Sequence, residues 1–131
     1  LQAMNTGHSG SLTTMHANSP VDALNRLETM ILMAGMDIPI KALREYIENA
    51  IDIVVHIERL NDGRRKITSI CEIDGFDDDT IKLKEIFEFK KNGMLNNDCV
   101  DGEFIRHDYI PKVYHELVSK GIDTLKDIFE A

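Results

Sequence analysis

Residues 53–73 read IVVHIERLNDGRRKITSICEI and contain the pattern that decides the fold class. In the first part of this stretch two sets of side chains alternate, Ile53, Val55 and Ile57 with Val54, His56 and Glu58. Asp62 and Gly63 then supply the positive φ of a tight hairpin turn, and residues 65–73 return as the partner strand. A third apolar stretch follows at residues 80–89, so we expect an antiparallel meander of three strands.

Two amphipathic helices are predicted upstream of the hairpin. The first begins at Ser19, an N-cap residue, with Pro20 at the first helical position and Asp22 in the first turn. Its apolar residues recur at helical spacing, Leu24, Leu27, Ile31 and Ala34. The second helix begins at Pro39 and buries Ile40, Leu43, Ile47, Ala50 and Ile51, while its charged residues point away, Lys41, Arg44, Glu45 and Glu48.

The C-terminal third is expected to differ from the rest. Residues 90–102 contain Gly, Asn and Asp without periodicity, which predicts a linker or surface loop. Residues 111–120 have a helical pattern ending at Gly121, and residues 124–129 can form one more helical turn. We therefore expect one part at residues 1–92, with two helices and the meander, and a second part at residues 93–131, a linker with a helical extension.

The beginning of the chain predicts a different kind of segment. Residues 1–7 are typical of the last turns of a helix closed by Gly7, so we expect a piece of a longer protein. Residues 11–16 follow as SLTTMH, a short strand rich in hydroxyl groups that ends at His16.

Composition limits the possible classes of function. The 131 residues include 43% hydrophobic and 29% charged side chains, the usual composition of a folded domain. With 15 Lys and Arg against 23 Asp and Glu, the formal charge of −8 argues against binding nucleic acid or anionic lipid through a basic face. The apolar runs are too short to cross a membrane, and two cysteines form no disulfide framework. We expect a cytoplasmic protein.

Most catalytic motifs do not fit these residues. The segment from Gly7 to Ser11 lacks the second glycine of a nucleophile elbow, and no phosphate-binding loop occurs. No histidine pair lies three or four residues apart on a helix and no Cys-x-x-Cys is present, so no metal site is expected. His56, His107 and His115 are interpreted as surface residues.

His16 has two open interpretations on the residues alone. In open α/β sheets ligands lie beyond the carboxyl ends of the strands, so Thr13, Thr14 and His16 would crowd a binding edge. Alternatively, this is an edge strand whose histidine only hydrogen-bonds the loop that follows.

A family resemblance favours the first interpretation. Residues 7–19, GHSGSLTTMHANS, closely resemble the histidine box of the traffic ATPases of type II and type IV secretion and pilus assembly. The similarity continues through residues 23–30, 33–36, 38–39 and 50–52 and looks most like the tight-adherence pilus branch. The tail, at residues 102–104, Pro111 and residues 120–122, is similar to the C-terminal extension of that branch.

The resemblance implies the C-terminal part of a RecA-like, hexameric motor of α/β class, with the phosphate-binding loop and the magnesium-binding strand upstream. It implies that His16 lies near the γ-phosphate of ATP, that His8 is the earlier histidine of the box, and that Thr13 and Thr14 contribute to the nucleotide site. ATP and Mg²⁺ belong to the full-length protein, and none is expected on this chain alone, which is expected to be inactive. Partners would be inner-membrane platform proteins, met at the inner face of the membrane without insertion. The alternative is a non-catalytic module that docks subunits or partners.

Overall fold

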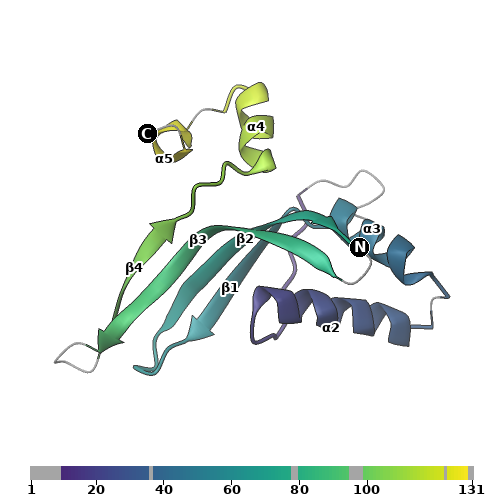
Figure 1. The fold of residues 1–131 in the computed structure, drawn as a ribbon, viewed down its shortest axis with the longest axis horizontal. Helices are drawn as coiled ribbons and strands as arrows, with labels where there is room; N and C mark the ends of the chain where they lie inside the picture. The colour runs from purple at the N-terminus through teal and green to yellow at the C-terminus, as the bar shows by residue number, and fades with distance from the viewer. Residues whose placement is uncertain (1–9, 36, 78–79, 95–98, 123, 130–131) are drawn as a thin grey trace.

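The computed structural model describes residues 10–35, 37–77, 80–94, 99–122 and 124–129, and Figure 1 shows their arrangement. Two helices, α2 (Pro20–Met33) and α3 (Ile40–Ala50), precede the strands β1 (Ile53–Arg59), β2 (Arg65–Phe76), β3 (Ile81–Met94) and β4 (Val100–Arg106). Two short helices follow, α4 (Lys112–Ser119) and α5 (Lys126–Phe129). The fold is therefore of α/β composition, and both predicted upstream helices and both predicted C-terminal helices are confirmed.

The sheet is a fully antiparallel meander with strand order β1-β2-β3-β4. Its first three strands confirm the prediction, whereas the fourth was not expected. The predicted linker at residues 90–102 is wrong at both ends, because β3 runs on to Met94 and β4 begins at Val100. The expected boundary between residues 92 and 93 thus lies inside β3.

Gly102, one of the residues that suggested a loop, lies inside the β3–β4 strand pair. It pairs with Lys91 across β3 and β4. A Cβ atom at this position would lie 2.5 Å from the carbonyl oxygen of Lys90 and 2.6 Å from the ring of Phe89. The glycine is therefore required by close packing within a strand pair, and not by a turn.

The strand predicted at residues 11–16 is not formed. Residues 11–17 have no regular secondary structure, and the four described strands pair with one another. A β-strand depends on hydrogen bonds to a neighbour, and none of these strands pairs with the segment.

Helices cover both faces of the sheet. Leu24 of α2 and Leu43 and Ile47 of α3 form one buried cluster with Ile73 and Ile81 of the sheet. A second cluster on the other face joins three buried residues of β3, α4 and α5, Ile86, Tyr114 and Phe129. Side chains alternate along a strand, so consecutive residues of β1 reach both clusters: Val54 packs on the first and Ile53 on the second.

The two faces of β1 are reversed relative to the prediction. Val55 and Ile57 are 48% and 58% exposed, whereas His56 is half-buried. His56, predicted to be a solvated strand residue, is therefore only partly exposed to solvent. Alternation of side chains shows that a strand has two faces, but it does not show which face is buried. That depends on where the helices pack.

A buried carboxylate attaches the C-terminal helices to the sheet. Glu72 of β2 is only 3% exposed and accepts hydrogen bonds from the backbone N–H groups of Lys112 and Val113, at 2.9 and 3.1 Å, and from the Tyr109 hydroxyl. Pro111, the N-cap residue of α4, makes no side-chain capping bond, and Glu72 instead satisfies the first two N–H groups of the helix. Burial, together with the acceptor Glu72, raises the pKa of Tyr109 above its usual range.

Within the described residues, no helix combines the length and the apolar character needed to span a bilayer.

Asp62 links the first hairpin to β4 and makes the stability of the fold depend on pH. Its carboxylate accepts the backbone N–H of Val100 and that of Arg64, both at 2.9 Å. These two bonds lower the pKa of Asp62 below its ordinary value of 3.8. Because the folded-state pKa is the lower one, the stabilisation is present above pH 3.8 and is lost as the pH falls through the folded pKa.

We expect Asp62→Asn to destabilise the protein at pH 7, because the amide is a weaker acceptor than the carboxylate. The difference from the wild type should shrink below about pH 4, where Asp62 itself becomes neutral. Urea unfolding at pH 7, 5 and 3 measures this, with Asp108→Asn at an exposed position as the matched control. A difference between wild type and variant that stays constant with pH would contradict the role of the charge.

Candidate functional site

The predicted site residues that the structure describes lie on one exposed segment leading into α2. Thr13, Thr14 and His16 are all solvent-exposed, and no hydrogen bond joins any of them to the described part of the chain. His8 lies outside the described residues. The structure therefore places three of the four predicted residues on one segment that is accessible to solvent.

The start of α2 holds the chain in place just after His16. The Ser19 hydroxyl accepts the backbone N–H of Asp22 at 3.1 Å, and Asp22 in turn accepts the backbone N–H of Asn18 at 2.9 Å. The two bonds are similar to a capping box, except that Asp22 accepts from Asn18 instead of Ser19, and they confirm the predicted helix start. The backbone two residues beyond His16 is thus fixed at the positive end of the α2 dipole.

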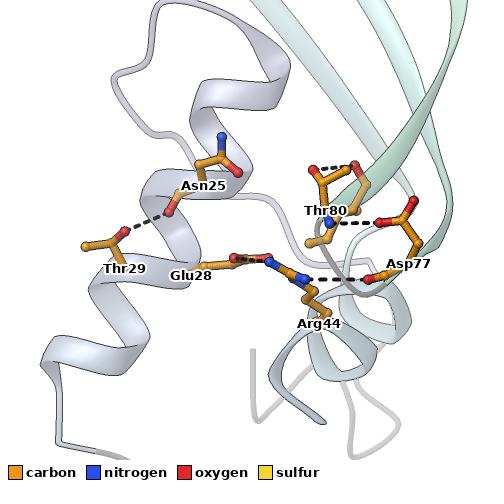
Figure 2. A network of polar contacts seen from close by, with 7 residues as sticks. Asn25, Glu28, Thr29, Arg44, Asp77 and Thr80 are labelled. Atoms are coloured by element: carbon orange, nitrogen blue, oxygen red, sulfur yellow. Dashed lines mark hydrogen bonds and ion pairs between the residues drawn. The ribbon is translucent and has the colours of Figure 1, made fainter. Parts of the chain in front are cut away.

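A buried ion pair fixes α2 to the rest of the fold, as Figure 2 shows. Glu28 of α2 meets Arg44 of α3 through two contacts, Nε to Oε1 at 2.9 Å and Nη2 to Oε2 at 3.4 Å. The third nitrogen of the guanidinium, Nη1, donates to the carbonyl oxygen of Asp77 at 3.5 Å, in the connection between β2 and β3. One side chain therefore joins both helices to the sheet.

The Asp77 turn is itself held by a local bond. Its carboxylate accepts the backbone N–H of Thr80 at 2.9 Å. The carbonyl that Arg44 reaches is therefore part of a defined turn.

The burial of Arg44 contradicts its predicted position on the solvent side of the helix. The sequence pattern predicts Arg44 on the solvent side of its helix, with Lys41, Glu45 and Glu48. Arg44 is instead only 8% exposed. Its position, one residue after Leu43 and three before Ile47, places it at the border of the apolar face, and this spacing is a sequence signal for its burial.

The remaining histidines fall into different environments. His115 is exposed on α4, as predicted. His107 is not an ordinary surface residue, because its imidazole Nε2 lies 3.6 Å from a carboxylate oxygen of Glu85 and 3.4 Å from one of Glu88. This grouping of three polar side chains from β3 and the end of β4 was not predicted.

The segment before α2 has a defined chemical capacity. A histidine and two threonines can donate hydrogen bonds to an anionic group such as a phosphate. Because these donors are exposed, they are accessible to such a group.

Known proteins resemble this chain in sequence. The family model described as "Type II/IV secretion system protein" matches residues 1–106. The conjugal transfer protein TrbB of Rhizobium radiobacter is 40% identical over 76 residues, which cover 58% of this chain and 22% of the relative. The type IV secretion system protein PtlH of Bordetella pertussis is 40% identical over 79 residues, covering 57% and 23% respectively. The chain thus spans little more than a fifth of the length of these relatives.

Removing one partner of the Glu28–Arg44 pair should strongly destabilise the fold. Arg44→Met leaves Glu28 buried and unpaired, which we expect to cost about 3–5 kcal/mol of the free energy of unfolding. The double variant Glu28→Leu with Arg44→Met removes both charges and should recover most of that loss.

Chemical denaturation of the 131-residue chain measures both effects. Arg26→Met, at an exposed position of α2, is the matched control and should change stability by less than about 0.5 kcal/mol. If Arg44→Met behaved like this control, the ion pair would not hold the helices in place.

Proposed function

The chain belongs to the family of type II/IV secretion system proteins, and from this membership we propose that it is part of an ATP-hydrolysing motor that drives protein export or pilus assembly. Two observations support the proposal. The relatives are named as conjugal transfer and type IV secretion proteins, and residues 7–19 resemble the histidine box of traffic ATPases. The accessible segment that carries His16 is the feature on which the proposal depends.

In this proposal His16 senses or orients the γ-phosphate of ATP. Its exposed imidazole, without a hydrogen-bond partner among the described residues, can donate to a phosphate oxygen. Thr13 and Thr14 lie on the same segment and would contribute hydroxyl groups to the nucleotide site, with His8 as the second histidine of the box. Hydrolysis of ATP depends mainly on positioning and on stabilising charge around the transferred group, which suits such donors.

The nucleotide itself would be held by other parts of the full-length protein. The described sheet is antiparallel and carries no phosphate-binding loop in its sequence. We propose that a RecA-like core supplies this loop and the Mg²⁺ site, and that residues 11–16 pair with its parallel sheet there. On this basis the isolated chain is inactive.

The structure suggests how a change at His16 would reach the rest of the motor. The segment enters α2 through the Ser19 cap, and the Glu28–Arg44 pair joins α2 to α3 and to the turn at Asp77. A displacement of the histidine on binding or loss of the γ-phosphate would therefore move two helices and the end of the sheet together.

We further propose a hexamer in the cytoplasm that meets inner-membrane platform proteins, of the tight-adherence type by resemblance. A second candidate function is a non-catalytic docking module. It is favoured by the exposed apolar side chains of Val55 and Ile57 on β1 and of Ile67, which pairs with Ile57 on β2.

The test is phosphate release by the full-length protein. We expect His16→Ala to lower the rate of ATP hydrolysis by about 10²-fold, the usual loss for one donor to a charged transition state, while ATP binding changes little. His115→Ala, an exposed histidine on α4, is the matched control and should retain full activity. Unchanged turnover and unchanged nucleotide-dependent domain closure in His16→Ala would reject the catalytic role and favour the docking module.

A further inference from the structure

Three side chains with metal-ligating atoms converge on one face of the sheet, away from the His16 segment in the chain. Glu85 and Glu88 belong to β3, and His107 follows directly after β4. One carboxylate oxygen from each glutamate and an imidazole nitrogen all lie within 4.8 Å of one another. The imidazole Nε2 is 3.6 Å from Glu85 Oε2 and 3.4 Å from Glu88 Oε2.

An irregularity in β3 brings the two glutamates together. Residues three apart in a regular strand point to opposite faces. Here Glu85 pairs with Cys71 and Glu88 pairs with Ser69. A step of three residues along β3 therefore lies opposite a step of two residues along β2, and the register shifts between the two pairs. This β-bulge turns both carboxylates to the same face, a use of bulges that is common near functional sites.

His107 joins them because the pairing of β4 extends beyond its last residue. The backbone N–H of His107 donates to the carbonyl oxygen of Ile86 at 2.9 Å, between the two glutamates in sequence. The imidazole is thereby held beside the bulge.

Two polar atoms at this place are shielded from solvent and make no hydrogen bond to the described residues, although the His107 side chain as a whole is 39% exposed. His107 Nε2 is inaccessible to solvent and makes no hydrogen bond, despite its short distances to the carboxylates. The hydroxyl of Thr68, a residue only 8% exposed, is also buried without a hydrogen bond. Thr68 lines a groove of about 390 Å³ together with Glu85 and Glu88. Polar atoms shielded from solvent usually make hydrogen bonds, so a ligand at this place would supply the contacts that these two atoms lack.

The surroundings orient the carboxylates without neutralising them. The Ser69 hydroxyl donates to Glu85 Oε1 at 2.6 Å and leaves Oε2 directed to the histidine. In metal sites, hydrogen bonds of this kind orient the carboxylates that bind the ion. Lys91, which lines the same groove, is paired with Glu58 at 2.7 Å. Among the described residues, no lysine or arginine forms an ion pair with Glu85 or Glu88.

We propose that Glu85, Glu88 and His107 form a binding site for a divalent transition-metal cation such as Zn²⁺. Zn²⁺ takes carboxylate oxygen and imidazole nitrogen at about 2.0–2.2 Å, which places neighbouring ligand atoms of a tetrahedron about 3.3–3.6 Å apart. The observed 3.4 and 3.6 Å match that edge. The imidazole favours Zn²⁺ over Mg²⁺, which prefers oxygen ligands and water. Water would complete the coordination from the open groove, and the ion would cross-link β3 to the end of β4.

Calorimetric titration of the metal-free 131-residue chain with ZnCl₂ at pH 7 tests the site. We expect one equivalent of Zn²⁺ to bind, and we expect Glu88→Gln and His107→Gln each to weaken binding at least 10-fold. His115→Gln and Cys99→Ser remove another histidine and the less buried thiol, so they are matched controls and should bind as the wild type does. These outcomes together support the site.

Heteronuclear NMR of the wild type provides a second measurement that does not depend on the folding of variants. One equivalent of Zn²⁺ should shift the imidazole resonances of His107 and leave those of His16 and His115 in place. The absence of stoichiometric binding would overturn the proposal and leave His107 as a polar neighbour of two glutamates. Zn²⁺ that binds equally well to Glu88→Gln and His107→Gln, or that shifts His16 in place of His107, would also overturn it.

Discussion

The Glu28–Arg44 ion pair is the contact on which the arrangement of the helices depends. Two charges removed from water are tolerated only where each finds good partners, and here the guanidinium uses all three nitrogens, on both oxygens of Glu28 and on the Asp77 carbonyl. Apolar contacts have no fixed direction, whereas a two-pronged ion pair has a defined geometry. It therefore determines how α2, and the His16 segment before it, sit on the sheet.

Buried charged side chains attach helices to both faces of the sheet, Arg44 on one face and Glu72 on the other. Glu72 binds the first turn of α4 in the way that Arg44 holds α2 and α3, with a buried charge that meets backbone groups. Between them, the bulged middle of β3 gathers Glu85 and Glu88 beside His107. The proposed nucleotide-sensing segment precedes α2, whereas the proposed cation site lies on β3 and after β4. Both are attached to the same four-stranded sheet, the first through the packing of α2.

The elements with strong local signals were predicted correctly. Ser19 and Pro20 define the start of α2, and Asp62 and Gly63 define the first hairpin, because capping and turn chemistry act within a few residues. The failures concern contacts between distant residues. The segment at 11–16 has strand composition without a pairing partner among the described strands, and Gly102 indicated a loop although it fits a tight strand pair. The exposure of Val55 and Ile57 depends likewise on where the helices pack.

The sequence by itself determined the order of helices and strands, the antiparallel hairpins and, through residues 7–19, the relationship to secretion proteins. These features depend on local periodicity and on short motifs, which are written in neighbouring residues. Only the tertiary structure decided that Arg44 is buried against Glu28, that Glu72 caps a helix forty residues away, and that Glu85, Glu88 and His107 meet. Each of these depends on strand register, bulges and the packing of helices, which join residues far apart in the chain and leave no periodic pattern in it.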